Sequence, residues 1–280
     1  MRGFTFGQFY PGSSVLHRLD PRTKVVVAVA YIVASFLCRN TVSFAVLLLS
    51  GLVLILISGI PMKVVLRSVR ALIFIMLFTA LLNIFWVVDN SVGATPLLEF
   101  YFITIYAKGI YHAVFILIRI LVMVVGTGLF LTYTTTPIAL TGALESLLRP
   151  LSKIKVPVHT FAMMMTIALR FIPTIMEETD KIMTAQKARG ADFTTGSLAQ
   201  RAKALIPIIV PLFVSVFRRA EELATAMECR CYHGGEGRTK LRVLKYRARD
   251  VIALLLMLLF VGGIVTINIC GARYGWFYTM

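Results

Sequence analysis

Residues 41–60 of the chain are TVSFAVLLLSGLVLILISGI and contain no charged side chain. A helix of about 20 apolar residues is roughly 30 Å long, which is the thickness of the hydrocarbon core of a bilayer. The composition of the whole chain agrees with this stretch: of 280 residues, 58% are hydrophobic and 15% are charged. Soluble globular domains carry about 25% charged residues. The sequence therefore predicts an all-α integral membrane protein.

Four further stretches come close to the length of a spanning helix, at residues 25–38, 71–88, 110–133 and 250–270. Only Arg39 and Asn40 separate the first of them from residues 41–60, which predicts a tight helical hairpin. Residues 97–106, LLEFYFITIY, are rich in aromatic side chains and suit an interfacial anchor or a short hairpin. We therefore expect about five transmembrane helices, four of them within residues 25–133.

The positions of the basic residues predict the orientation. The chain has 29 Lys plus Arg against 13 Asp plus Glu, and the basic residues flank the spans, which favours a membrane rather than nucleic acid as the partner of this charge. Because basic loops face the cytoplasm, we expect residues 1–24 to form a cytoplasmic N-terminal segment. We expect residues 134–249 to form one long cytoplasmic domain and residues 250–280 the last span with an outer tail. Basic residues before the first span and between the second and third are Arg2, Arg18, Arg22, Lys24, Lys63, Arg67 and Arg70.

Within residues 134–249, local signals predict one short and two long helices. Residues 137–152 have leucines at helical spacing. A long helix is expected from about 157 to 190, because Pro157 suits a first turn and Gly190 a C-terminal cap. A second is expected from about 197 to 231, because Ser197 and Gln200 have capping-box spacing. The prolines inside these helices, Pro173, Pro207 and Pro211, are expected to bend them.

The two long helices end in similar sequence motifs. TAQKARG at residues 184–190 recurs as TAMECRC at 225–231, an offset of 41 residues. Upstream positions match as well and predict a core-facing apolar stripe on each helix: Ile175 with Val216, Met176 with Phe217, Thr179 with Ala220, Ile182 with Leu223, and Met183 with Ala224. A single arginine at a helix C-terminus only favours the helix dipole. Two equivalent helix ends, here called the tips, with small residues beside each guanidinium, indicate docking to two related grooves of a cytoplasmic dimer or pseudo-dimer.

The chain resembles the transmembrane T component of energy-coupling factor transporters, the EcfT or CbiQ-like family, over most of its length. The resemblance rests on GQFYPGSSVLHRLDPRTK (7–24), LRFIPTIMEETDKIMTAQKARGADF (169–193) and AEELATAMECRCYHGGEGRTKLR (220–242). It implies a bacterial cell-membrane subunit that docks two ABC ATPase subunits, alike or different, through two coupling helices ending in Ala-Arg-Gly-like triplets. Ala188, Arg189 and Gly190 match that triplet, whereas Cys229, Arg230 and Cys231 keep only its arginine.

The resemblance further implies a substrate-binding membrane S component as partner, uptake of a vitamin or other micronutrient, and no cofactor in this chain, since the partner subunits bind ATP. A dedicated permease of a single-substrate importer, for example of cobalt, nickel or biotin, remains an alternative, as do a self-sufficient channel and a membrane enzyme.

Other motifs predict no catalytic or metal site. HGGEGRTK at 233–240 lacks the Gly-Lys-Ser/Thr ending of a phosphate loop. Cys229, Cys231 and His233 lack the spacing and the four ligands of structural zinc. Arg119 falls inside a spanning segment, which predicts either a functional intramembrane residue or an interior arginine satisfied by carbonyls or a carboxylate. His17, His112 and His159 are isolated, and each is expected to be a hydrogen-bonded structural histidine.

Overall fold

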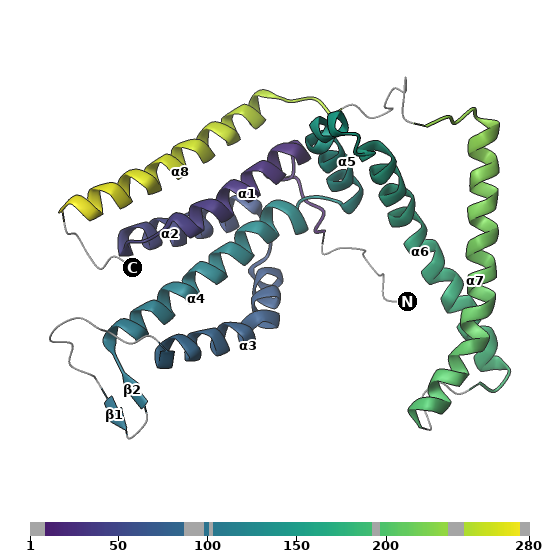
Figure 1. Cartoon of the computed structure of the whole chain (residues 1–280), viewed down its shortest axis with the longest axis horizontal. Coiled ribbons are helices and arrows are strands. Elements are labelled where there is room, and N and C mark those ends of the chain that lie inside the picture. The colour runs from purple at the N-terminus through teal and green to yellow at the C-terminus, as the bar shows by residue number, and fades with distance from the viewer. Residues whose placement is uncertain (1–8, 87–97, 101–102, 192–196, 235–243, 275–280) are drawn as a thin grey trace. The chain divides into compact units, whose positions relative to one another are not determined.

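The computed structural model describes residues 9–86, 98–100, 103–191, 197–234 and 244–274. Apart from one short hairpin, the elements in these ranges are helices (Figure 1), and the prediction of an all-α membrane protein is confirmed. The chain forms two compact units, one of residues 1–143 with 244–280 and one of residues 144–243. In chain order the elements are α1 (Pro21–Leu37), α2 (Thr41–Ser58), α3 (Met62–Trp86), β1 (Leu98–Phe100), β2 (Ile103–Ile105), α4 (Ala107–Thr127), the π-helix η1 (Gly128–Thr132), α5 (Pro137–Leu148), the 3-10 helix η2 (Arg149–Ile154), α6 (Val158–Ala188), α7 (Leu198–Cys229) and α8 (Ala248–Tyr274).

Six helices in the described ranges are long and apolar enough to cross a membrane: α2, α3, α4 with η1, α6, α7 and α8. Four of them coincide with stretches predicted from the sequence. The remaining predicted stretch, residues 25–38, belongs to α1, which has 17 residues. The helices α6 and α7 are the least apolar of the six, and their cytoplasmic location stays a prediction.

Two details of the membrane segments differ from, or refine, the sequence prediction. The helix α3 begins at Met62, nine residues before the predicted stretch 71–88, so Lys63, Arg67 and Arg70 lie within its first turns. Hydropathy locates an apolar stretch, whereas a helix continues for as long as its backbone hydrogen bonds do. Figure 1 shows α3 bent early in its length. The strands β1 and β2 pair antiparallel, with Leu98 opposite Ile105, which confirms a short hairpin in residues 97–106.

The core of the first unit is built around α1. Tyr31 is 2% exposed, and its ring lies 6.0 Å from the rings of both Phe130 and Phe260. Its hydroxyl lies 3.1 Å from the Ser50 hydroxyl. A Cβ atom at Gly126 would overlap the Tyr31 ring, so only glycine lets α4 approach α1 this closely. Although it has only 17 residues, α1 therefore packs against both α4 and α8 and contacts α2 through the Tyr31 hydroxyl.

A buried polar cluster ties the start of α1 to the start of α8. Asp20 caps α1 by accepting the N–H of Arg22 at 2.9 Å, and its own N–H donates to Oδ1 of Asp250 at 2.7 Å. The other carboxylate oxygen of Asp250 accepts the N–H of Arg247 at 2.8 Å. Lys24, which is 2% exposed, donates from Nζ to the carbonyl of Thr134 at 2.7 Å. Residues 230 positions apart are thereby held together by buried hydrogen bonds.

A second polar cluster joins the α1–α2 corner to α8. Ser43 donates to Oδ1 of Asn268 at 2.8 Å, and Nδ2 of Asn268 donates to the carbonyl of Leu37 at 2.6 Å. The latter bond satisfies one of the carbonyls that the end of α1 leaves without an intrahelical donor. The tight hairpin predicted at residues 39 and 40 is thus fixed by a side chain of α8.

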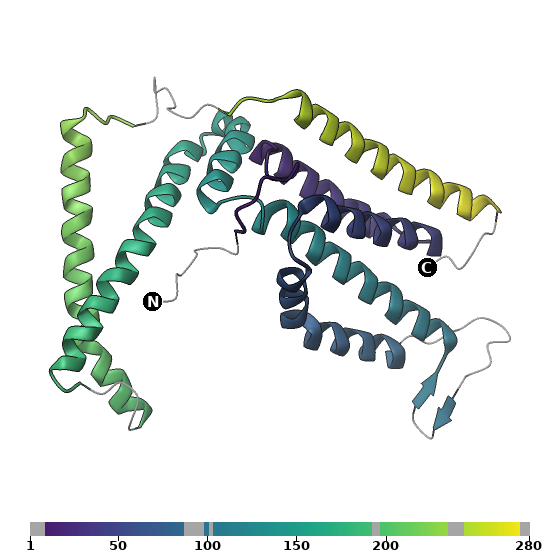
Figure 2. The ribbon, with the colours of Figure 1, turned by 180° about the vertical axis from the view of Figure 1, so that it is seen from behind.

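The second unit holds the long helices α6 and α7, and their bounds agree with the predicted ranges within two residues. The capping box is confirmed, because Oγ of Ser197 accepts the N–H of Gln200 and Oε1 of Gln200 accepts the N–H of Ser197. The helix α6 continues through Pro173. In contrast, α7 contains Pro207 and Pro211 and is bent in Figures 1 and 2.

Candidate functional site

The predicted triplet at the end of α6 forms a left-handed cap. Ala188 is the last residue of the helix, and Arg189 follows with φ −85° and ψ 5°. Gly190 has φ +86°. The N–H of Gly190 donates to the carbonyl of Lys187, and the N–H of Ala191 donates to the carbonyl of Gln186, both at 3.0 Å. This pair of bonds defines a Schellman motif, in which glycine is the residue that adopts a positive φ without strain.

The end of α7 has the same cap, built from different residues. Cys229 ends the helix, and Arg230 follows with φ −95° and ψ 18°. Cys231 takes the left-handed position with φ +55°. Its N–H donates to the carbonyl of Glu228 at 2.8 Å, and the N–H of Tyr232 donates to the carbonyl of Met227 at 3.1 Å. Each donor and acceptor lies 41 residues after its counterpart in α6. The 41-residue sequence repeat is therefore also a repeat of backbone conformation.

Both arginines are exposed and available to another surface. Neither forms a salt bridge or a side-chain hydrogen bond with any residue of the described ranges. A guanidinium carries five donors in a planar fork, which suits a carboxylate or a row of carbonyls. The residues beside each arginine are small: Ala188 and Gly190 flank Arg189, and Cys229 and Cys231 flank Arg230. They leave room for another surface to approach the guanidinium.

The helices meet at equivalent positions. Nη2 of Arg219 in α7 lies 3.3 Å from Oε2 of Glu178 in α6, and these residues are 41 positions apart. Arg189 follows Glu178 by 11 residues, and Arg230 follows Arg219 by the same number, which is about 16 Å along a helix. Figures 1 and 2 both show the C-terminal ends of α6 and α7 at opposite ends of the helix pair. The two tips are thus separated and equally far from the contact that joins their helices.

The apolar stripe is present on both helices, but its burial differs from the prediction. Phe217, Ala220 and Ala224 were predicted to face a core, and all three are exposed. On α7 an exposed apolar face runs along the helix at spacings of one and three or four residues; its members are Leu205, Ile206, Ile209, Val210, Phe213, Val214 and Phe217. The residues 41 positions earlier in α6 are also apolar: Met164, Met165, Ala168, Leu169, Ile172, Pro173 and Met176. Periodicity shows that a face is apolar but not what covers it.

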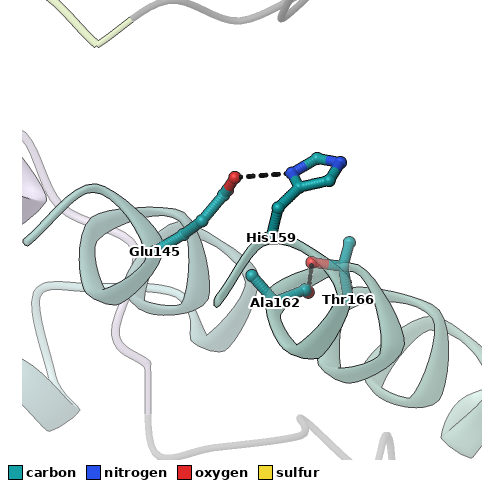
Figure 3. Close-up of polar contacts among 4 residues, drawn as sticks. All are labelled: Glu145, His159, Ala162 and Thr166. Carbon is teal, nitrogen blue, oxygen red and sulfur yellow. Dashed lines mark hydrogen bonds and ion pairs between the residues drawn. The ribbon is translucent and has the colours of Figure 1, made fainter. Parts of the chain in front are cut away.

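A hydrogen bond between two side chains joins α5 to the beginning of α6. Nδ1 of His159 lies 2.9 Å from Oε1 of Glu145 in α5 (Figure 3). The 3-10 helix η2 lies between these two residues in the chain and is followed by Lys155, which has φ +63°. The pair closes this corner by joining the helix before it to the helix after it. His17 is also hydrogen-bonded, to Oγ of Ser14 at 2.6 Å, so both of these histidines are structural, as predicted.

Arg119 lies in the first unit and not with the tips. Its Nη2 donates to the carbonyl of Cys38, the C-cap of α1, at 2.9 Å. Its guanidinium also lies 5.2 Å from the ring of Phe44, a favourable cation–π distance. This agrees with the predicted interior arginine that donates to a carbonyl, although its buried Nε has no hydrogen-bond partner in the described ranges. A functional role for Arg119 stays a prediction.

The remaining chemistry is sparse. No group of three or more His, Cys, Asp or Glu side chains in the described part of the chain could hold a metal ion. Cys229 and Cys231 are exposed free thiols, and Nδ1 of His233 bonds the carbonyl of Cys231 at 2.9 Å. Residues 235–240 of the HGGEGRTK loop lie outside the described residues.

Two contacts between different helices were not predicted from the sequence, the Glu178–Arg219 pair and the Asp20–Asp250 bond. The Glu178–Arg219 pair could have been found, because the 41-residue offset aligns Glu177 and Glu178 with Arg218 and Arg219 and so places opposite charges at equivalent positions. The Asp20–Asp250 contact had no such signal, since it joins two distant segments that share no repeat.

Comparisons with known proteins agree with this architecture. The family described as CbiQ, cobalt transport protein, matches residues 12–241. A relative from Thermosediminibacter oceani, called energy-coupling factor transporter transmembrane protein EcfT, is 46% identical over 95% of this chain and 98% of its own length. Proteins with the same name from Clostridium kluyveri and Bacillus subtilis are 48% and 45% identical, over 93% and 89% of this chain and 95% and 92% of their own lengths. The chain belongs to the CbiQ family and is the multi-pass transmembrane component of an energy-coupling factor transporter.

Proposed function

We propose that this chain is the coupling subunit of an ATP-driven importer, in which two cytoplasmic ATPases dock on the tips of α6 and α7. The observation that carries the proposal is the duplicated tip. The same Schellman cap, the same exposed arginine and the same distance to the interhelical contact occur twice. A single receptor would need only one such tip. Two equal tips at opposite ends of a helix pair fit a partner with two equivalent grooves.

The apolar faces of α6 and α7 would connect the ATPases to the membrane subunit that binds the substrate. The exposed face of α7, from Leu205 to Phe217, is too long and too apolar for a surface that stays in water. We assign it, with the equivalent face of α6, to contact with the substrate-binding membrane subunit. A movement of either tip would pass along its helix to this face, because a helix transmits displacement along its axis. The cargo on this proposal is a vitamin or another micronutrient, and the partner subunits bind the ATP.

The docking proposal is tested by reversing the charge of each tip. Arg189→Glu and Arg230→Glu are expected each to reduce co-purification of the ATPases, and the double variant to abolish it, because a carboxylate repels the acceptor that the guanidinium binds. Arg218→Glu is the matched control: it is the same change on an exposed arginine of α7, one that lies away from the tip. ATP-driven substrate uptake should fall in the same order. Unchanged co-purification of the double variant would refute the proposal.

A dedicated permease of one metal or vitamin importer is the second candidate, and the description of the matching family as a cobalt transport protein favours it. Co-purified membrane partners distinguish the two. Several alternative small membrane subunits would indicate a shared coupling module, and a single one would indicate a dedicated system. Reconstitution of the chain alone tests the channel alternative, since the coupling proposal predicts no transport without the ATPases.

The proposal places the N-terminus and residues 134–249 in the cytoplasm of a bacterial cell. An epitope tag at the N-terminus should therefore resist protease added to intact spheroplasts and become cleavable after lysis. Cleavage before lysis would reverse the orientation and remove the ATPases' access to the tips.

A further inference from the structure

Five basic residues lie within a few residues of the start of α1 or α8: Arg18, Arg22, Lys245, Arg247 and Arg249. The two segments that carry them are held together by the bond from the N–H of Asp20 to Asp250. In addition, the guanidinium of Arg22 lies 5.4 Å from the ring of Tyr246. Residues from opposite ends of the chain therefore form one basic cluster.

The two carboxylates in this region form no salt bridge with the five basic side chains, which outnumber them. Asp20 is 8% exposed and Asp250 is 2% exposed, and their oxygens accept the backbone N–H groups of Asp20, Arg22 and Arg247. None of the five basic side chains forms a salt bridge with another residue in the described ranges. Moreover, Nε of Arg22 is buried and lacks a hydrogen-bond partner there. The cluster therefore has donors and positive charge without matching acceptors.

The position of the cluster along α8 places it at a membrane boundary. From Asp250 to Asn268 the helix advances 18 residues, about 27 Å, close to the roughly 30 Å of the hydrocarbon core. The polar contacts of Asn268 mark the far boundary. Tyr246 is 56% exposed beside the basic residues, and tyrosine is enriched where a membrane meets water. The phosphates of lipid headgroups lie at this depth.

We propose that the cluster binds the phosphate of an anionic phospholipid headgroup. Arginine forks match phosphate oxygens in pairs, and basic residues directly outside a spanning helix attract anionic lipids. The bound headgroup supplies acceptors to the cluster and anchors the first turn of α8, the helix that follows residues 144–243 in the chain. This inference rests on the membrane position of α8 and is independent of ATPase docking.

The test is a lipid titration of the purified full-length chain in neutral detergent, with phosphatidylglycerol or phosphatidylcholine and native mass spectrometry as the readout. Lys245→Gln with Arg247→Gln is the test variant, because the backbone N–H of Arg247 still reaches Asp250. Arg201→Gln with Lys203→Gln, two exposed residues of α7, is the control that removes the same charge. Phosphatidylglycerol binding should weaken about 30-fold in the test variant at low ionic strength and less than about twofold in the control. Arg249→Gln alone should weaken it about fivefold, which provides a second variant with a smaller perturbation.

Three results would overturn the proposal: equal binding of the two lipids by the unaltered chain, an equal loss in test and control variants, or displacement of the lipid by millimolar inorganic phosphate. The last would assign the cluster to a soluble anion. Docking of the ATPases at the tips would be unaffected by any of these results.

Discussion

Exchanging glycine and cysteine at the left-handed position of the two caps tests whether the tips share one backbone geometry. Gly190 has φ +86° and Cys231 has φ +55°. A residue with a side chain loses about 1–2 kcal/mol in this conformation, while glycine loses about 0.4–1 kcal/mol more conformational entropy than alanine on folding. Nothing lies within 4 Å of a Cβ atom added at Gly190, so packing does not enter the difference there.

Cys231→Gly should therefore stabilise the α7 cap by about 0.5–1 kcal/mol, and Gly190→Ala should destabilise the α6 cap by a similar amount. The assay is hydrogen exchange of the amides that close the two caps, those of Tyr232 and Ala191. Since RT is about 0.6 kcal/mol, exchange should slow roughly two- to fivefold at Tyr232 and accelerate by a comparable factor at Ala191.

Gly142→Ala is the matched control, because Gly142 lies within the helix α5 with open space around its Cα. There the same substitution should stabilise the helix, by roughly 0.5–1 kcal/mol. If Cys231→Gly accelerates exchange at Tyr232, or if Gly190→Ala leaves exchange at Ala191 unchanged, the two caps do not share a left-handed residue and the tips are not equivalent.

Three further predictions concern packing and charge. Glu178→Arg or Arg219→Glu alone should lower the thermal unfolding midpoint of the purified chain, by the equivalent of about 0.5–1 kcal/mol for a partly exposed pair, and the double exchange should recover it; no recovery would mean that the two side chains do not interact. Asp250→Ala removes the acceptor of one buried amide, that of Asp20, and one partly buried amide, that of Arg247, and should cost about 2–4 kcal/mol, measured by the same unfolding, whereas Asp180→Ala, at an exposed position, should be nearly neutral. Gly126→Ala should destabilise by about 1–3 kcal/mol through overlap with Tyr31, whereas Gly262→Ala has open space; equal effects in denaturant titration would contradict this packing.

Local signals predicted the parts of the fold that depend on neighbouring residues. The capping box at Ser197 and the C-terminal cap at Gly190 each depend on bonds within six residues, and both were visible in the sequence. The left-handed conformation of Cys231 was not, because cysteine does not favour a positive φ. Only the 41-residue offset, carried through to the backbone, would have predicted it.

Contacts between distant segments could not be predicted from the sequence. The bond from Asp20 to Asp250 and the bond from Arg119 to the carbonyl of Cys38 join helices whose order in space the sequence does not specify. The start of α3 was missed for a different reason: Lys63, Arg67 and Arg70 lower the hydropathy of its first turns without opposing helix formation.

The contact between Glu178 and Arg219 has a consequence for symmetry. When two helices are related by a local two-fold axis, the residue on the axis faces its own counterpart. Two identical helices would place glutamate against glutamate or arginine against arginine, and like charges at that point would push them apart. Two repeated helices that contact each other through oppositely charged residues at equivalent positions must therefore differ in sequence at those positions. Such a pair requires two diverged copies, which this chain carries within one polypeptide, and a symmetric dimer of a single helix could not form it.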